Sequence, residues 1–145
     1  MTVVFDAEPL LAFSFDEPGA AEVESWLDQI YDGKINGYVS TINLAEFRYI
    51  AARKTSVDEA DAYIDALREM GVNTSDIDEL WEAVSGLKTN YALSLGDAYA
   101  LAAARALDNS EQNVTLLVGA DDDYNPFEND EGFNHLIARF RNDAA

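Results

Sequence analysis

The chain has 145 residues, of which 48% are hydrophobic, and its 28 acidic against 9 basic side chains give a formal net charge of −19. The length suits one domain spanning residues 1–145, since domains commonly run to about 100–200 residues, and the apolar content excludes a disordered chain. The absence of cysteine excludes disulfide scaffolds, thiol nucleophiles and cysteine zinc sites, and the single histidine, His135, excludes a multi-histidine metal site.

The hydrophobic pattern predicts strands and helices that alternate along the chain. Ser40 or Thr41, Ser56 and Ser94 can cap the helices that follow them. Val114–Val118 is the strongest strand, and its continuous apolar run is typical of a central strand that is covered on both faces. The order of the elements points to a single α/β domain. In chain order we expect a strand at 2–5, helices at 10–13 and 23–30, a strand at 38–40, helices at 41–54 and 56–70, a strand at 72–73, helices at 77–91 and 94–109, a strand at 114–118, a polar loop at 119–125, and a strand or helix at 135–140.

The unusual acidity has two interpretations. One is a surface that repels nucleic acid and anionic membranes. The other is adaptation to high salt, which the scarcity of lysine favours, and at molar salt the Debye length falls to about 3 Å so that surface repulsion is screened. No stretch approaches the roughly 18 apolar residues that a membrane span needs, and the N-terminus reaches Asp6 without a basic region. We therefore expect a cytoplasmic protein with no membrane partner.

Four groups of acids differ from the rest in their apolar surroundings or their position after a strand. Asp6 follows the first strand, residues 121–123 follow the last strong strand, and Glu46 and Asp97 lie within apolar helices. In open α/β sheets, ligands bind beyond the carboxyl ends of the strands. Carboxylates that converge raise each other's pKa, and a bound divalent cation reverses this. Ligands that are all carboxylates favour Mg²⁺ or Mn²⁺.

Each of these acids also has a purely structural interpretation. Asp6 could end a strand and cap the next helix, and Glu46 could pair with Arg48 or Arg53. Asp97 could interact favourably with the dipole of its helix, and the three aspartates could form an ordinary polar loop. The metal-site hypothesis therefore depends on the four groups occurring together.

The segments that hold these acids resemble the PIN-domain ribonucleases and, within them, the VapC-type toxins of toxin–antitoxin pairs. The resemblance covers nearly the whole chain and depends on the order and spacing of the segments. It implies a PIN-like α/β domain with a short central parallel sheet of four to five strands, flanked by helices in three layers. The segments are Val4-Phe5-Asp6 with Pro9-Leu10-Leu11, Ser40-Thr41-Ile42-Asn43-Leu44-Ala45-Glu46, Gly96-Asp97-Ala98-Tyr99-Ala100-Leu101-Ala102 and Leu117-Val118-Gly119-Ala120-Asp121-Asp122-Asp123-Tyr124.

The resemblance implies metal-assisted hydrolysis of an RNA phosphodiester. A bound Mg²⁺ or Mn²⁺ would polarise a phosphate oxygen and activate a water molecule. The last motif usually reads Thr-Ala-Asp-x-Asp-Phe in the family, so Gly119 lacks the hydroxyl of the threonine, and Asp122 occupies the variable position. The catalytic residues that the resemblance implies are Asp6, Glu46, Asp97 and Asp121, and the implied metal ligands are these four and Asp123.

The substrate and partners are further implications of the resemblance. The family's habits imply an RNA substrate, a cognate antitoxin and a homodimer. The helical hairpin at 44–70 is a candidate surface for the antitoxin or the dimer, and the alternative is that its apolar stripe belongs to the core. Candidate phosphate contacts, which could equally be surface ion pairs, are Arg48, Arg53, Lys54 and Arg105.

Three alternatives compete with the nuclease hypothesis. Val3 to Glu8 loosely resembles the Asp-x-Asp motif of haloacid-dehalogenase-like phosphatases, but Glu8 stands where that family has aspartate. An EF-hand loop starting at Asp121 fails because it needs glycine at its sixth position and glutamate at its twelfth, where Pro126 and Gly132 stand. A PIN-like binding or assembly module that has lost activity stays open, because Gly119 replaces threonine and basic residues are few.

Overall fold

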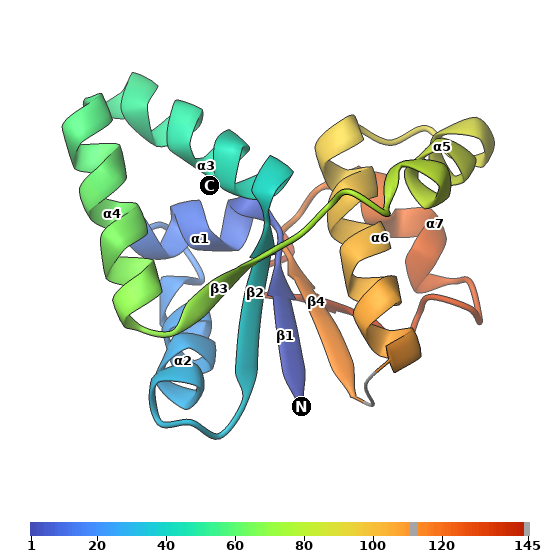
Figure 1. Cartoon of the computed structure of the whole chain (residues 1–145), viewed down its shortest axis with the longest axis horizontal. Helices are drawn as coiled ribbons and strands as arrows, with labels where there is room; N and C mark the ends of the chain where they lie inside the picture. Colours follow the sequence, from blue (N-terminus) through green and yellow to red (C-terminus); the bar gives the residue numbers. More distant parts are fainter. Residues whose placement is uncertain (111–112, 144–145) are drawn as a thin grey trace.

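A five-stranded parallel sheet forms the centre of the computed structural model, which describes residues 1–110 and 113–143. The strand order is β3-β2-β1-β4-β5, and every neighbouring pair is parallel. Helices cover both faces (Figure 1), so the predicted three-layer α/β fold with up to five strands is confirmed. The strands are β1 (Thr2–Phe5), β2 (Asn36–Ser40), β3 (Val72–Ser75), β4 (Val114–Val118) and β5 (Ile137–Arg139).

The helices divide into two groups, one on each face of the sheet (Figure 1). None of the helices in the described ranges is both long and apolar enough to cross a membrane. One face carries α1 (Ala7–Ser14), α2 (Ala20–Tyr31), α3 (Thr41–Lys54) and α4 (Val57–Glu69), and the other carries α5 (Trp81–Asn90), α6 (Leu95–Ser110) and the short α7 (Asn125–Glu128), which follows the 3₁₀ turn η1 (Asp122–Tyr124).

The alternation of side chains along the strands explains the two layers. In β1, Val3 and Phe5 pack among α1 to α4, whereas Val4 packs against α6 on the other face. In β4, Leu117 points to the first face while Leu116 and Val118 point to the second. All six side chains are fully buried, which explains the continuous apolar runs in the sequence.

The predicted caps are confirmed at three helix starts. Ser40 Oγ accepts a hydrogen bond from the backbone N–H of Asn43 at 3.1 Å, and Ser56 Oγ does the same for Glu59 at 3.1 Å. Ser94 Oγ accepts from the N–H of Asp97 at 3.1 Å. These bonds satisfy backbone donors that a helix start leaves free, so each serine sets where its helix begins.

Several predicted boundaries differ from the structure. The helix expected over 77–91 is reduced to Trp81–Asn90, because the side chain of Asp76 accepts from the N–H of Asp78 and holds residues 76–78 in a turn. The strand predicted at 38–40 begins at Asn36, and the strand predicted at 72–73 extends to Ser75. The loop expected at 119–125 contains η1 and the start of α7, and the ambiguous tail forms β5.

The carboxyl ends of the strands meet along one edge of the sheet, at the top in Figure 1. Phe5 pairs with Val39 of β2 and with Leu117 of β4, so the residues that follow these strands lie together. The N-terminus of α6 lies at the same edge, because α6 runs back down the second face (Figure 1). This edge is therefore where the sequence-predicted carboxylates converge.

Candidate active site

Asp6 lies directly after β1 and has two tasks. Its Oδ1 caps α1 by accepting from the N–H of Ala7 at 2.8 Å, and its Oδ2 accepts from the hydroxyl of Tyr124 at 2.9 Å. The side chain is buried, with 5% of the residue exposed. Burial raises the pKa of Asp6 from 3.8 to about 6, and the nearby charge of Glu46 adds to the rise. The predicted cap and the predicted site residue are thus one side chain.

Asp97 occupies the first turn of α6 and is 6% exposed. Its buried Oδ2 receives no hydrogen bond from any group in residues 1–110 and 113–143. Burial, followed by the negative charge of Asp6, raises the pKa of Asp97 from 3.8 to about 10. A buried carboxylate oxygen without a donor is costly, so this atom requires a proton or a cation.

Asp97, Asp121 and Asp123 form one carboxylate cluster, in which one oxygen from each residue lies within 4.8 Å of the others. Asp121 Oδ1 also accepts from the N–H of Asp123 at 2.9 Å, which shapes the turn after β4. Asp123 Oδ2 accepts from the N–H of Ser94 at 2.8 Å and so ties this turn to the start of α6. The predicted partners from two distant segments are therefore brought together.

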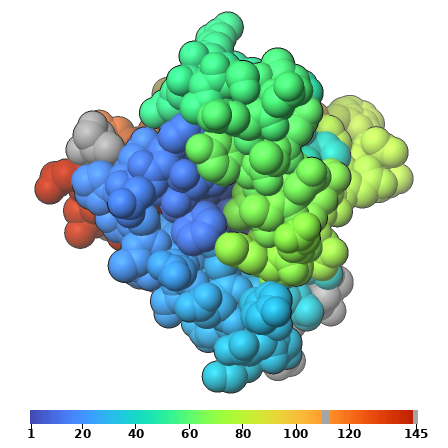
Figure 2. Space-filling model, turned by 90° about the vertical axis from the view of Figure 1, so that its left-hand side faces the viewer, coloured from blue at the N-terminus to red at the C-terminus, as the bar shows by residue number. Residues whose placement is uncertain are grey.

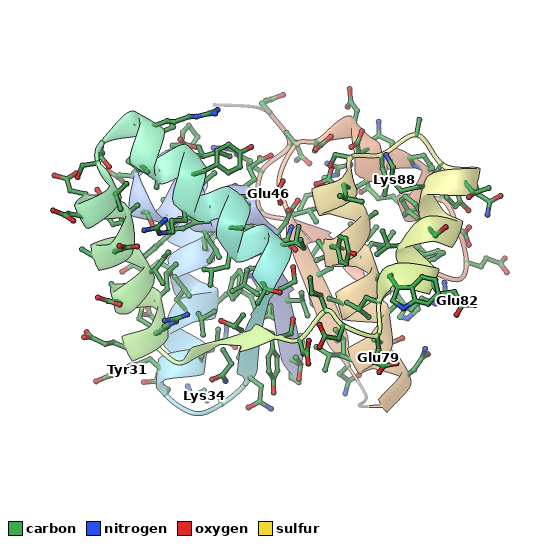
Figure 3. The ribbon with its side chains drawn as sticks, turned by 45° about the horizontal axis from the view of Figure 1, so that its top comes forward. Tyr31, Lys34, Glu46, Glu79, Glu82 and Lys88 are labelled. Carbon is green, nitrogen blue, oxygen red and sulfur yellow. The ribbon has the colours of Figure 1, made fainter. Side chains whose placement is uncertain are left out.

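Glu46 reaches this edge from α3, on the side of the helix that faces α6 (Figure 3). Its carboxylate lies against Gly96, and a Cβ at position 96 would overlap both carboxylate oxygens. Gly96 is therefore needed for close approach rather than for its backbone freedom. Because Gly96 directly precedes Asp97, Glu46 lies beside the carboxylate cluster.

Asn43 connects Glu46 to Asp6 and α6. Its Nδ2 donates to Glu46 Oε1 at 2.8 Å, to the carbonyl of Gly96 at 3.0 Å and, more weakly, to Asp6 Oδ1 at 3.5 Å. The hydroxyl of Ser40 donates to Asn43 Oδ1 and so fixes the orientation of the amide. Asn43 is fully buried, and its amide is a neutral donor among acids.

The donor set suits a divalent cation of the hard, oxygen-binding type. Asp97, Asp121 and Asp123 offer carboxylate oxygens at close range, and the unpartnered Oδ2 of Asp97 is an atom that such an ion would satisfy. Asp6 and Glu46 adjoin the cluster through Asn43. Asp122, at the variable position, is exposed, and its side chain accepts from the side chain of Asn125 at 3.4 Å.

Gly119 makes room for another acid that the sequence did not single out as a site residue. A Cβ at position 119 would overlap the carboxylate of Glu8. Glu8 Oε2 accepts from the N–H of Ala120 at 3.0 Å and pairs with Arg141 Nε at 3.1 Å. Gly119 departs from the family pattern, and the Glu8 carboxylate occupies the space that a side chain at position 119 would fill.

Two of the candidate phosphate contacts form ion pairs, one with an acid on α4 and one with an acid in the turn between α1 and α2. Arg48 donates to both oxygens of Asp61 on α4, at 2.7 and 3.2 Å, and this pair raises the pKa of Arg48 and lowers that of Asp61. Lys54 Nζ lies 3.4 Å from Glu17 Oε2. The ion-pair alternative therefore describes both residues, and a contact with RNA stays a prediction.

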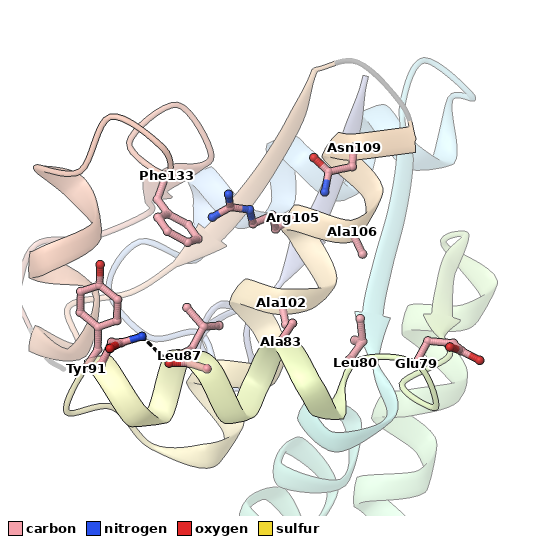
Figure 4. Close-up of a pocket in the computed structure, with 12 residues that line it drawn as sticks. Glu79, Leu80, Ala83, Leu87, Tyr91, Ala102, Arg105, Ala106, Asn109 and Phe133 are labelled. Carbon is pink, nitrogen blue, oxygen red and sulfur yellow. Dashed lines mark hydrogen bonds between the residues drawn. The ribbon is translucent and has the colours of Figure 1, made fainter.

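The other two candidates stack on aromatic rings. The guanidinium of Arg53 lies 5.1 Å from the ring centre of Tyr49, within α3. Arg105 lies 4.3 Å from the ring centre of Phe133, in a cavity of about 540 Å³ between α5 and α6 (Figure 4). Arg105 is about 12 Å along the axis of α6 from Asp97, at 1.5 Å per residue. None of these contacts brings a candidate to the carboxylates, and their role in RNA binding stays a prediction.

Sequence reasoning missed the roles of Asn43, Tyr124 and Glu8. Tyr124 offered a signal, because it replaces the phenylalanine of the family motif and a buried tyrosine hydroxyl needs a partner. Here the partner is Asp6, and burial together with that charge raises the pKa of Tyr124. Asn43 and Glu8 offered none, since their partners lie on other segments of the chain.

Comparisons with known proteins agree with this geometry. A search of curated proteins gives no significant match. Among solved structures, the chain is similar to one described as VapBC2 from Rickettsia felis bound to a DNA fragment from their promoter, with a TM-score of 0.68 and 14% sequence identity over 96% of this chain and 98% of the other. At that identity the likeness concerns the fold. The PIN domain family matches residues 3–125, and the chain therefore belongs to the PIN domain family.

Proposed function

We propose that this protein is a ribonuclease that depends on Mg²⁺ or Mn²⁺. The observation that carries the proposal is the buried, unpartnered Oδ2 of Asp97 within a group of three carboxylates at the carboxyl edge of the sheet. Membership of the PIN domain family supports a nuclease. The chain has no cysteine and one histidine, so hydrolysis that needs no protein nucleophile suits its chemistry.

Some of the residues would bind the ion, and others would orient the residues that bind it. Asp97, Asp121 and Asp123 would bind the ion, with Asp6 and Glu46 beside them. When bound, the ion supplies a polarised phosphate oxygen and an activated water.

Two uncharged residues keep the neighbouring carboxylates in position. Asn43 directs the Glu46 carboxylate toward Gly96, and Tyr124 fixes one oxygen of Asp6. Because both are uncharged donors, they orient the acids without neutralising them.

The phosphatase alternative finds no support at Asp6. The two oxygens of Asp6 accept hydrogen bonds from Ala7 N–H and from Tyr124, which fits a helix cap, and Glu8 stands where the phosphatase family has its second aspartate. The match to the PIN domain family also argues against this alternative.

We further propose that the protein is the toxin of a toxin–antitoxin pair in the cytoplasm, with a protein antitoxin and a homodimeric state. The resemblance to VapC-type toxins and the similarity to the VapBC2 structure support this. The hairpin of α3 and α4 lies beside α1 on the face shown in Figure 2. Its stripe of Phe47, Ala51 and Ile64 is buried in the core, so a partner would have to contact the outer side, where a hollow of about 560 Å³ lies between α3 and α4.

The test is cleavage of tRNA and rRNA with Mn²⁺ by the wild type, Asp97→Asn and Asp122→Asn. The two variants make the same chemical change, but only Asp97 belongs to the cluster, whereas Asp122 is exposed. We expect Asp97→Asn to lose cleavage and Asp122→Asn to keep it. Equal background cleavage by wild type and Asp97→Asn would contradict the proposed nuclease. A wild type that binds Mn²⁺ but cleaves nothing would favour the inactive binding module.

A further inference from the structure

Arg139, at the end of β5, holds the loop that carries two of the three cluster carboxylates. Its side chain is 12% exposed. Nη1 donates to the carbonyls of Gly119 at 2.7 Å and of Asp121 at 3.1 Å. Nη2 donates to Asn125 Oδ1 at 2.8 Å and to Glu128 Oε1 at 2.7 Å, and Nε donates to the same Glu128 oxygen at 2.9 Å. A guanidinium has five N–H donors, and these contacts use all of them.

The position of these contacts matters for the carboxylates. A cation near an acidic cluster ordinarily pairs with the acids and occupies their oxygens. Arg139 instead binds the backbone carbonyls of Gly119 and Asp121 and pairs with Glu128. The cluster oxygens of Asp121 and Asp123 are thus left to other partners, while the backbone that bears them is fixed.

The loop needs such a restraint because its acids repel their neighbours. Three consecutive aspartates follow Ala120, and two of them lie within 4.8 Å of the buried Asp97. Carboxylates that are ionised at this range repel one another, which favours a loop displaced from α6 unless something restrains its backbone. The two carbonyl contacts of Arg139 oppose that displacement from β5, the edge strand that pairs with β4.

We propose that Arg139 is a positioning residue for the metal ligands, one that fixes Asp121 and Asp123 through the loop backbone. This inference rests on the proposed metal-dependent function. Arginine suits the task because its planar fork spans several acceptors, whereas the ammonium of a lysine is a compact point charge with three donors. Lys at position 139 would keep the charge and lose most of the contacts.

The test measures Mn²⁺ binding by the electron paramagnetic resonance of free Mn²⁺, in 1 M KCl to screen the surface acids. Four proteins are compared: wild type, Asp97→Asn, Arg139→Lys and Glu128→Gln. We expect Arg139→Lys to weaken the Kd by about 10–100-fold, the usual effect of removing a group that orients metal ligands. Glu128→Gln keeps an acceptor for Arg139 and both carbonyl contacts, so its Kd should equal that of the wild type.

The outcomes separate this inference from the proposed function. Equal Mn²⁺ binding by wild type and Asp97→Asn contradicts the metal site itself. If Asp97→Asn loses binding while Arg139→Lys binds like the wild type, Arg139 has no positioning role, even if the substitution lowers the Tm. If circular dichroism shows Arg139→Lys to be unfolded, Arg139→Gln is measured in its place, because it also removes the guanidinium and its contacts to the two carbonyls. Weaker Mn²⁺ binding by a folded Arg139→Gln supports the inference, and binding equal to that of the wild type overturns it.

Discussion

Gly96→Ala is predicted to abolish cleavage while leaving the protein as stable as the wild type or slightly less stable. The three heavy atoms nearest to the added Cβ would be Oε1, Oε2 and Cδ of Glu46, and the Cβ would overlap all three. These atoms are the far end of a flexible, half-buried side chain, so the carboxylate can swing away without disturbing the backbone. The substitution therefore acts as a selective displacement of Glu46.

Two contributions to the free energy of unfolding of Gly96→Ala have opposite signs. Alanine in place of glycine within a helix stabilises by about 0.5–1 kcal/mol, and Gly96 lies in the first turn of α6, where the gain is at most this. Against it stands the lost hydrogen bond from Asn43 Nδ2 to Glu46 Oε1, worth about 1 kcal/mol. A catalytic group displaced by about 1 Å costs about 10²-fold in rate, so cleavage should fall by at least that factor.

Gly86→Ala is the matched control. Gly86 lies inside α5 with nothing within 4 Å of its added Cβ, so it gains the same helix propensity without touching the site. RNA cleavage rates and urea unfolding curves are measured for both variants. We expect Gly86→Ala to be more stable and fully active.

The reasoning is refuted if Gly96→Ala cleaves RNA at the wild-type rate. Glu46 would then have no role at the position where the structure places it. A large loss of stability in Gly96→Ala would refute the weaker claim that only the far end of Glu46 has to move. The double variant Glu46→Gln with Gly96→Ala should cleave RNA no more slowly than either single variant, because both substitutions remove the same contribution, that of the Glu46 carboxylate.

Three further predictions follow from burial and charge. Burial raises the pKa values of Asp6 and Asp97 in the folded protein from 3.8 to about 6 and about 10. In the metal-free protein, both carboxyls are therefore protonated below about pH 4, where they do not lower the free energy of unfolding. That free energy falls as the pH rises through about 6 and 10. Asp97→Asn should therefore have a higher free energy of unfolding in urea than the metal-free wild type, by about 1–3 kcal/mol at pH 8 and by less at pH 5. Mn²⁺ should stabilise only the wild type. Equal urea midpoints for the two proteins at both pH values would contradict this prediction. Gly119→Ala should lower the Tm, since its Cβ would overlap the Glu8 carboxylate, and differential scanning calorimetry with Glu8→Ala as a second change should show the loss relieved. Cleavage and stability should both rise between 0.1 and 2 M KCl, because the −19 charge is screened there, and cleavage that falls steadily with salt would contradict salt adaptation.

The placement of Asp6 and Asp121 could be predicted because it depends on local patterns. Each follows an apolar run, and parallel strands bring their carboxyl ends to one edge. Ser94 could likewise be predicted as a cap, and the cap places Asp97 in the first turn of its helix. These assignments need only the strand and helix periods and the chemistry of a helix start.

Other features of the site depend on contacts between distant segments. Asn43 meets Gly96, and Glu8 meets Ala120, across separations that no local pattern reports. Arg139 lies in a strand of three residues, which is too short for its alternation to be distinguished from a helical turn. Sequence reasoning therefore identified the acids but could not identify the residues that orient them.

The distribution of positive charge leaves the acidic cluster without a basic side chain as a partner. Arg48, Arg139 and Arg141 pair with acids away from the cluster. Across residues 1–110 and 113–143, no ion pair includes Asp97, Asp121 or Asp123. The cluster can therefore be neutralised only by protons or by a bound ion, and protons make its oxygens poor ligands. In the proposed ribonuclease, an RNA phosphate would meet the same negative charge, so a bound ion would also help the substrate to approach the site.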